Sequence, residues 1–276
     1  MKERFQEIDA KNDQLVRQLK SHSRAKDYLE RFELSWVYHD SSLEGTVYTP
    51  QELQAALMPH LPAKEASLMP VVLEIRNHKA AIDYARAEAK HTSKKSTQIS
   101  LAVIKRLHDL FLGNTPEAQA ARAAVERREK SEKELAKERE RAGFRKDMPL
   151  HRTYFHDIAQ PGKIQAGLDK LVEVTAGSEF RDSHPIKQAA TVQHAFMQIF
   201  PFAEHSGKVG RMLTNLVLMR GGYQPCLIHS IDRQRYYESL KGPVAAFRTL
   251  LMDALENSLD NGVEFFQEQS RTYRSV

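Results

Sequence analysis

Cysteine is almost absent from this sequence, and the single Cys226 excludes a disulfide framework and a cysteine-rich zinc site. Glycine and proline are scarce as well, at 12 and 11 of 276 residues. No apolar run reaches the roughly 18 residues of a membrane span, and the charged first ten residues do not resemble a secretory signal. We therefore expect a cytoplasmic protein with no membrane partner, built mainly from helices.

The sequence also lacks a large excess of charge of either sign. The chain carries 41 Lys and Arg against 36 Asp and Glu, which leaves a net charge of +5 and a pI near 9.1. An excess this small spread over so many charged residues gives a weak field, so nucleic acid is permitted as a partner but not indicated. A hydrophobic share of 41% is ample for a folded core.

Apolar residues recur at intervals of three and four along several stretches, which predicts helices. Alternation with a period of two is rare, and residues 153–158 are the best candidate for a short strand. The sequence thus predicts an all-α fold with one short β-hairpin. The helical stretches are 103–111, 192–200, 212–219 and 245–259.

The segment 116–141 differs in composition, because Glu, Lys, Arg and Ala dominate it. Glu126 and Lys130 lie at the i, i+4 spacing that supports an exposed helix. A solvated, protruding helix or helical pair is the favoured interpretation. A nucleic-acid arm is the weaker one, because acids and bases alternate along the segment.

The segment 200–211 contains the candidate phosphate-binding and metal-binding residues. Its sequence is Phe-Pro-Phe-Ala-Glu-His-Ser-Gly-Lys-Val-Gly-Arg, between two apolar helices. Backbone amides at the start of the second helix, together with Lys208 and Arg211, would make a pocket for phosphate. Glu204 is a candidate ligand for Mg²⁺, which commonly takes one or two carboxylates plus phosphate oxygens. The alternative is an ordinary turn with solvated cations. It is not a P-loop, because no Ser or Thr follows Lys208.

This segment resembles the motif of the Fic family, His-Pro-Phe-x-Asp/Glu-Gly-Asn-Gly-Arg/Lys-x-x-Arg, without a gap. Residues 101–110 resemble the family's Ile-x-x-Leu-His helix, and 142–145 its Gly-x-Tyr-Arg element. Residues 154–171 resemble the flap hairpin that docks a target, with its exit helix. The matching motif positions are Pro201, Phe202, Glu204, Gly207, Lys208 and Arg211.

The resemblance implies transfer of a nucleotide monophosphate, usually AMP from ATP, onto a protein hydroxyl. It implies Mg²⁺ as cofactor at Glu204, a target protein as partner and, as an open possibility, a homodimer. It assigns Tyr154, His156 and Ile158 to target docking. The residues that it assigns to phosphate or nucleotide binding are Ser206, Gly207, Lys208, Gly210, Arg211, Asn215, Tyr236 and Tyr237.

Two departures from the motif put transfer in doubt. Phe200 stands where the family has the His that takes the proton of the target hydroxyl, and a phenyl ring accepts no proton. His205 and Ser206 replace the Gly-Asn pair of the anion loop. His205 is a candidate for a displaced base or a phosphate contact, and the alternative is that it only packs in the loop. Loss of acid–base assistance costs typically about 10²–10⁴ in rate.

Residues 41–45, Ser-Ser-Leu-Glu-Gly, resemble the family's inhibitory helix motif, Ser/Thr-x-x-x-Glu-Gly/Asn. The resemblance implies that Glu44 pairs with Arg211 and prevents productive seating of the γ-phosphate. The departure is Asp40, which stands four residues before Glu44 in place of Ser or Thr. The alternative is that Glu44 is a helix-end carboxylate with no regulatory role.

We therefore expect one Fic-type domain, with an N-terminal inhibitory region over 1–60, a core over 61–276 and a charged insertion over 116–141. The leading hypothesis is a divergent protein that binds a phosphate-bearing, nucleotide-like ligand, with AMP transfer impaired or replaced by altered chemistry. The alternative is an inactive pseudoenzyme that serves binding or regulation. A nucleic-acid-associated factor is a weaker alternative.

Overall fold

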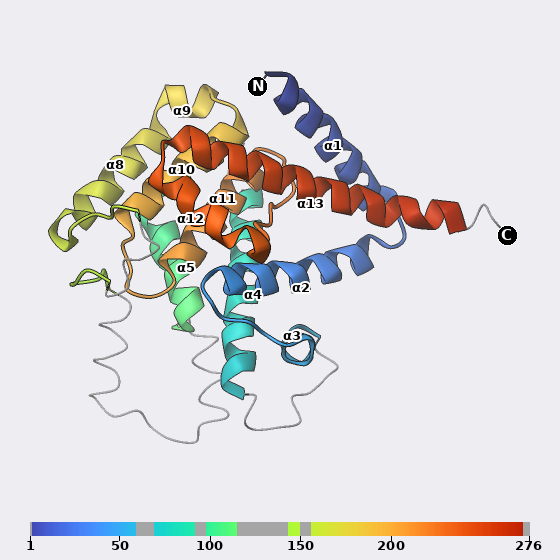
Figure 1. Ribbon diagram of the computed structural model, residues 1–276, viewed down its shortest axis with the longest axis horizontal. Helices are drawn as coiled ribbons and strands as arrows, with labels where there is room; N and C mark the ends of the chain where they lie inside the picture. Colours follow the sequence, from blue (N-terminus) through green and yellow to red (C-terminus); the bar gives the residue numbers. More distant parts are fainter. Residues whose placement is uncertain (1, 59–68, 92–97, 115–142, 150–155, 273–276) are drawn as a thin grey trace.

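The computed structural model describes residues 2–58, 69–91, 98–114, 143–149 and 156–272. Helices dominate these ranges, and no strand occurs within them. The all-α prediction is therefore confirmed for the described chain (Figure 1). The helices are α1 Lys2–Ser21, α2 Ala25–Leu43, α3 Pro50–Leu57, α4 Met69–His91, α5 Leu101–Leu112, α8 Ile164–Ala176, α9 Ser178–Asp182, α10 Pro185–Ile199, α11 Ser206–Arg220, α12 Arg233–Lys241 and α13 Val244–Thr272.

The strand predicted over 153–158 is only partly described, because residues 153–155 lie outside the described ranges. Residues 156–160 are described, and they are not in a strand. A 3₁₀ turn at Pro161–Lys163 then leads into α8, in the place predicted for the exit helix. The charged segment 116–141 is likewise outside the described residues.

α11 lies at the centre of the fold, and every residue from Ser206 to Leu218 is buried. α10 packs on one side of it and α4 on another. Gly210 permits the close approach of α10, because a Cβ there would lie 3.2 Å from both the Phe196 ring and the Met197 sulfur. The α1 helix lies along the distal part of α13, which projects from the bundle in Figure 1.

Local signals explain where the helices begin and end. Thr49 and Glu52 form a reciprocal capping box at the start of α3, with Pro50 in the first turn. The Ser100 hydroxyl caps α5, and Gly113 ends that helix in the left-handed conformation. α10 ends at Ile199, and its C-cap Phe200, which precedes Pro201, also has a left-handed backbone.

The hydrophobic core is continuous across the N-terminal helices and the rest of the bundle. α2 and α3 both pack against α4, so α2 brings its C-terminal end next to the start of α11. The division at residue 60 stays a prediction. No helix among the described residues is both long and apolar enough to cross a membrane.

Candidate functional site

The first half of the 200–211 loop is held by Arg145. Its Nε donates to the carbonyl of Phe200 at 2.7 Å, and Nη2 donates to the carbonyl of Ile199 at 3.3 Å. The Arg145 backbone N–H also donates to the Pro201 carbonyl at 2.9 Å. These bonds satisfy carbonyls that the end of α10 leaves without partners in the helix. Arg145 thus fixes the loop's entry from a segment that precedes it by 55 residues.

Phe200 is buried and adopts φ 46°, which is uncommon for a bulky residue. The position where the motif has its proton acceptor therefore holds an apolar ring on a strained backbone. Such strain costs on the order of 1–3 kcal/mol, and the surrounding contacts must maintain it.

The middle of the loop is held by a side chain of the loop itself and by His108 of α5. The Ser206 hydroxyl accepts from the backbone N–H of Phe202 at 2.8 Å and donates to its carbonyl at 2.9 Å. The His108 ring stacks on Phe202 with centroids 3.7 Å apart, and its Nε2 lies 3.2 Å from the Glu204 carbonyl. Glu204 itself is exposed. The loop therefore presents this carboxylate to solvent on a rigid support.

Both cations at the start of α11 are buried and paired with acids. Lys208 Nζ lies 3.3 Å from Oε1 of Glu74, which is a residue of α4. Arg211 Nη2 lies 2.8 Å from Glu44 Oε1, the pair predicted from the sequence. Arg211 Nε also donates to the carboxylate of Asp40. The cations face the interior of the site, and neighbouring carboxylates compensate their charge.

Glu44 occupies the place where the helix start would meet an anion. A Cβ built on Gly207 would lie 2.0 Å from Glu44 Oε1 and 3.0 Å from Arg211 Nη1. Only glycine at 207 leaves room for this carboxylate against the backbone. Arg211 Nη1 is buried and has no hydrogen-bond partner among the described residues. These residues fit a phosphate oxygen in the place of the Glu44 carboxylate.

The side chains of the site also determine whether it could hold a cofactor metal. No group of three or more His, Cys, Asp or Glu side chains that could hold a metal occurs in the described part of the chain. Mg²⁺ bound through phosphates needs only one or two protein carboxylates, and the exposed Glu204 fits that role. Such an ion would neutralise phosphate charge when bound.

Several predicted nucleotide-binding residues have their polar groups engaged within the fold. Asn215 exchanges two hydrogen bonds with the backbone of Cys226, at 3.1 and 2.7 Å. Tyr236 is fully buried and accepts from Gln193 Nε2 at 3.0 Å. The Tyr237 hydroxyl donates to the Leu43 carbonyl at 3.0 Å. Their role in nucleotide binding stays a prediction.

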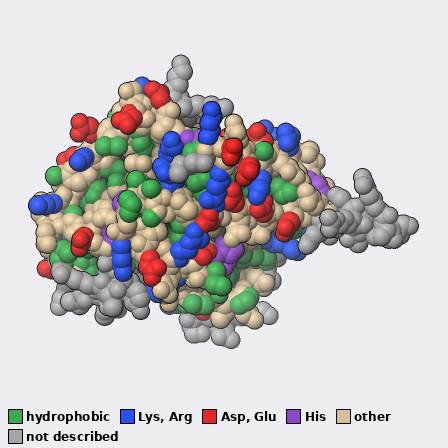
Figure 2. All heavy atoms as spheres, turned by 45° about the horizontal axis from the view of Figure 1, so that its top comes forward, with side chains coloured by type: hydrophobic (Ala, Val, Ile, Leu, Met, Phe, Trp, Pro, Cys, Tyr) green, Lys and Arg blue, Asp and Glu red, His purple; other side chains and the backbone are tan. Residues whose placement is uncertain are grey.

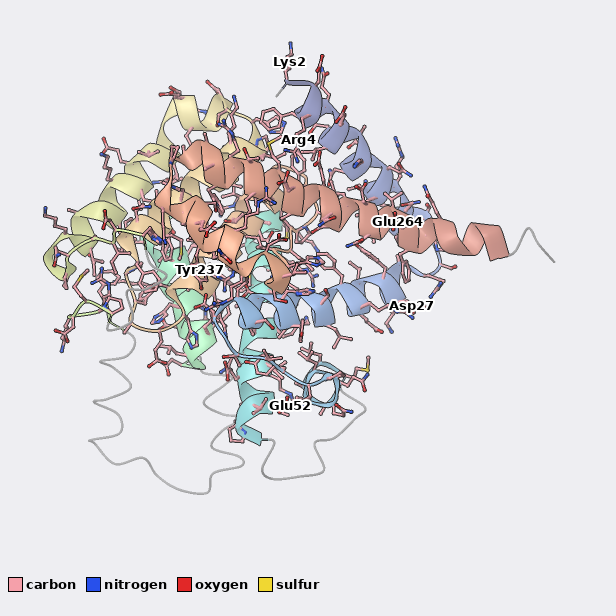
Figure 3. The ribbon with its side chains drawn as sticks, viewed as in Figure 1. Lys2, Arg4, Asp27, Glu52, Tyr237 and Glu264 are labelled. Carbon is pink, nitrogen blue, oxygen red and sulfur yellow. The ribbon has the colours of Figure 1, made fainter. Side chains whose placement is uncertain are left out.

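Tyr237 instead marks where α2 is anchored, and Figure 3 labels it beside the end of that helix. Arg233 Nε donates to the same Leu43 carbonyl at 2.9 Å. Leu43 directly precedes Glu44, so two donors from α12 fix the helix end that carries this carboxylate. Beside Asp40 and Arg211 a cavity of only about 10 Å³ remains, which is room for about one water molecule.

The histidines differ in what surrounds them. His205 has φ 63°, and burial together with Lys208 lowers the pKa of its ring to about 4. His156 is buried, with Nε2 2.6 Å from the Met197 carbonyl, and its role in target docking stays a prediction. Ile158 packs partly buried against the core, and Tyr154 lies outside the described residues. His194 is half-buried, and its Nε2 lies 2.9 Å from the Gly242 carbonyl.

Sequence reasoning missed Glu74 and His78, and it recorded Asp40 only as a departure from a motif. His78 Nε2 lies 3.0 Å from Asp40 Oδ2, and both side chains are buried. A signal was available, because Asp40 precedes Glu44 by one helical turn and Glu74 precedes His78 by one turn. That spacing places each pair on one face of its helix.

The model of the Fic/DOC family matches residues 98–218, which include α5, α8, α9, α10 and all but the last two residues of α11. Residues 98–218 form a Fic/DOC family domain. The chain outside this range is covered by the relatives below.

Two curated relatives are the proteins named protein adenylyltransferase Fic from Drosophila persimilis and Aedes aegypti. They are 24% and 23% identical over 262 and 261 residues, which is 93% of this chain in both cases. The chain spans only 46% and 47% of their lengths. These matches indicate distant homology.

Two solved structures share the fold. Fic-1 (residues 134–508) from C. elegans has a TM-score of 0.69 at 20% identity, over 95% of this chain and 71% of that one. A Fic domain containing signaling protein from Bacteroides thetaiotaomicron has a TM-score of 0.68 at 20% identity, over 92% and 97%. The all-α Fic-type fold therefore extends beyond residues 98–218.

Proposed function

We propose that this protein binds the phosphates of a nucleotide at Gly207–Arg211 and that Glu44 holds the site closed in the absence of ligand. The observation that carries the proposal is the placement of the Glu44 carboxylate against Gly207 and Arg211. A carboxylate and a phosphate compete for the same helix start and the same guanidinium. The names of the curated relatives, protein adenylyltransferase, support ATP as the ligand.

Binding in this proposal involves a divalent cation at Glu204. The carboxylate is exposed at the edge of the loop, within the segment whose backbone His108 and Ser206 hold in place. A cation there would offset the charge of the phosphates, which otherwise meet Glu44 and Glu74. We therefore expect binding to require Mg²⁺.

Transfer of AMP to a hydroxyl is slow or absent in this proposal. Phe200 cannot accept the hydroxyl's proton. His205, the candidate for a displaced base, has a pKa lowered to about 4, so its neutral ring is a poor proton acceptor at pH 7. This low pKa favours the pseudoenzyme over an enzyme with altered chemistry.

Calorimetric titration of the protein with ATP and Mg²⁺ tests the binding step. We expect weak binding to the unaltered protein and clear binding to Glu44→Ala, lost when EDTA removes Mg²⁺. Glu30→Ala is the matched control, because Glu30 is an exposed acid on the same helix. If Glu44→Ala binds ATP no better than Glu30→Ala does, the proposal is wrong.

A nucleic-acid role stays the weaker prediction. Basic and acidic side chains are interspersed over the face in Figure 2 and do not gather by sign. Arg4 pairs with Asp253 and Glu256 between α1 and α13, and Arg235 also pairs with Asp253. Cations compensated in this way offer little to a phosphate backbone. The target protein and a homodimer also stay predictions.

A further inference from the structure

Six charged or titratable side chains from three helices meet at the start of α11. Each helix contributes two of them, one turn apart, and we call this set the charge cluster. Its three carboxylates face two cations, so one negative charge is in excess if the imidazole is neutral. Burial lowers the pKa of His78, which leaves that ring neutral at pH 7. The members are Asp40 of α2 and Glu44, which caps the C-terminal end of α2, Glu74 and His78 of α4, and Lys208 and Arg211 of α11.

The two carboxylates on Arg211 are not equivalent. The side chains of Arg211 and Asp40 are each only 5% exposed, whereas the side chain of Glu44 is 29% exposed. A charge pair with little solvent around it interacts more strongly than a screened pair does. Asp40 also makes a second contact, because its backbone carbonyl accepts from Arg211 Nη2 at 3.0 Å. Asp40 is therefore the stronger partner of Arg211.

His78 and Ser41 surround the far side of the Asp40 carboxylate. His78 Nε2 lies 3.0 Å from Asp40 Oδ2, without the alignment of a hydrogen bond. The other ring nitrogen, Nδ1, lies 3.5 Å from the Ser41 hydroxyl. Phe111 packs edge-on against the His78 ring at 5.1 Å. The Asp40 side chain is thus enclosed in the fold and only 5% exposed, whereas the Glu44 side chain is 29% exposed.

Burial would raise the pKa of Asp40, but the Arg211 guanidinium outweighs burial and holds that pKa well below its usual range. The carboxylate is thus charged at neutral pH, next to the place where a phosphate would bind. A negative charge fixed at this position repels an anionic ligand and neutralises the cation that should attract it.

We propose that Asp40 is a second inhibitory carboxylate that withholds Arg211 from anionic ligands independently of Glu44. This inference rests on the proposed function and concerns the regulation of the same site. Removal of Glu44 alone leaves two carboxylates facing two cations, which gives a neutral cluster. Neutralisation of Asp40 as well makes the cluster cationic. Glu44 is then the more exposed inhibitory carboxylate, and Asp40 is the buried one that lowers the net charge of the cluster.

The test is a set of four proteins: unaltered, Glu44→Ala, Asp40→Asn and the double variant. Asn keeps an oxygen that can accept from Arg211 Nε while removing the charge. We expect the double variant to bind Mg²⁺–ATP at least about tenfold more tightly than Glu44→Ala, with both measured by calorimetry. Asp40→Ser in the Glu44→Ala background serves as a second variant, and thermal unfolding checks that each protein is folded.

Asp27→Asn is the matched control. It makes the same charge change at the opposite end of α2, where Figure 3 labels Asp27 far from Tyr237, and its side chain is 56% exposed. We expect it to leave binding unchanged in the Glu44→Ala background. An equal gain from Asp27→Asn would mean that net charge alone is responsible, and it would overturn the inference.

Inorganic pyrophosphate, titrated into the same proteins, separates the two proposals. If Glu44→Ala and the double variant bind ATP equally, Asp40 is not inhibitory and the proposed function stands. If pyrophosphate affinity rises along the series while ATP never binds, the second carboxylate stands and the nucleotide ligand is wrong. Failure of every folded variant to bind either probe overturns both.

Discussion

The two ends of the 200–211 loop differ in chemistry. At the Phe200 end the side chain is apolar, and the polar contacts are backbone carbonyls that accept from Arg145. At the Gly207–Arg211 end the polar contacts are ion pairs between buried cations and three carboxylates. The residues that our proposal assigns to phosphate binding are thus all present, whereas the residue at position 200 cannot accept a proton. The proposal therefore separates binding from proton transfer.

Introduction of an imidazole at position 200 is expected to give the largest effect, because it supplies the proton acceptor that this end of the loop lacks. We expect Phe200→His in the Glu44→Ala background to gain AMP transfer by about 10²–10⁴ over Glu44→Ala alone, the usual range for acid–base assistance. Incorporation of label from α-labelled ATP, into the protein itself or added proteins, measures the gain. His also tolerates the positive φ of this position better than Phe does.

Phe200→Asn is the control for that experiment, because Asn fits the left-handed backbone but is no base. A gain with Asn equal to the gain with His would show that relief of strain, and not proton transfer, is responsible. Silence of the His variant in a protein that binds ATP would mean that the Phe200 end has lost more than its base.

The two cations at the other end provide the next comparison. Arg211→Met leaves the buried Asp40 carboxylate without its main partner, which should cost about 3–5 kcal/mol in the free energy of unfolding. Lys208→Met should cost only about 1 kcal/mol, because Glu74 is 39% exposed on its side chain and regains water. Urea denaturation measures both.

Asp40→Asn should recover much of the stability lost in Arg211→Met, because it removes the uncompensated charge. The same substitution in the Lys208→Met background should give no such recovery. Equal losses for the two cation variants, or no recovery by Asp40→Asn, would contradict the assignment of Asp40 as the stronger partner of Arg211.

The sequence predicted the parts of this arrangement that depend on neighbours along the chain. Apolar residues at intervals of three and four predicted α5, α10, α11 and α13, because one helix face meets the core. The contact between Glu44 and Arg211 followed only from resemblance to a family, since no local rule joins residues so far apart.

The rest could not be predicted because it depends on how three helices cross. Glu74 and Lys208 are separated by 134 residues, and their contact requires α4 to lie against α11. The burial that lowers the pKa of His205 is also set by packing, since a histidine in a polar loop is ordinarily exposed. Of the predicted flap, Tyr154 lies outside the described residues, and the burial of His156 depends on its packing against α10.

His205 lies between the two ends of the loop, and its titration gives the smallest effect. Its pKa falls from 6.5 to about 4 in the folded protein because of burial and Lys208. Between these values the unfolded chain binds a proton that the folded protein excludes, so stability falls as pH drops from 6.5 toward 4. His39, stacked on His229, has a pKa lowered to about 4 for similar reasons and adds to the same slope.

His205→Asn should therefore flatten the dependence of unfolding free energy on pH over this window by up to about 1.4 kcal/mol per pH unit, the value for one proton. Asn suits the left-handed backbone at 205, so stability at pH 7.5 should change little. Denaturation at pH 7.5, 6 and 5 measures the slope, and His39→Asn is the comparison outside the loop. An unchanged slope in His205→Asn would mean that this imidazole titrates normally. It would then be available as a proton acceptor near neutral pH, and the division between the two ends of the loop would no longer hold.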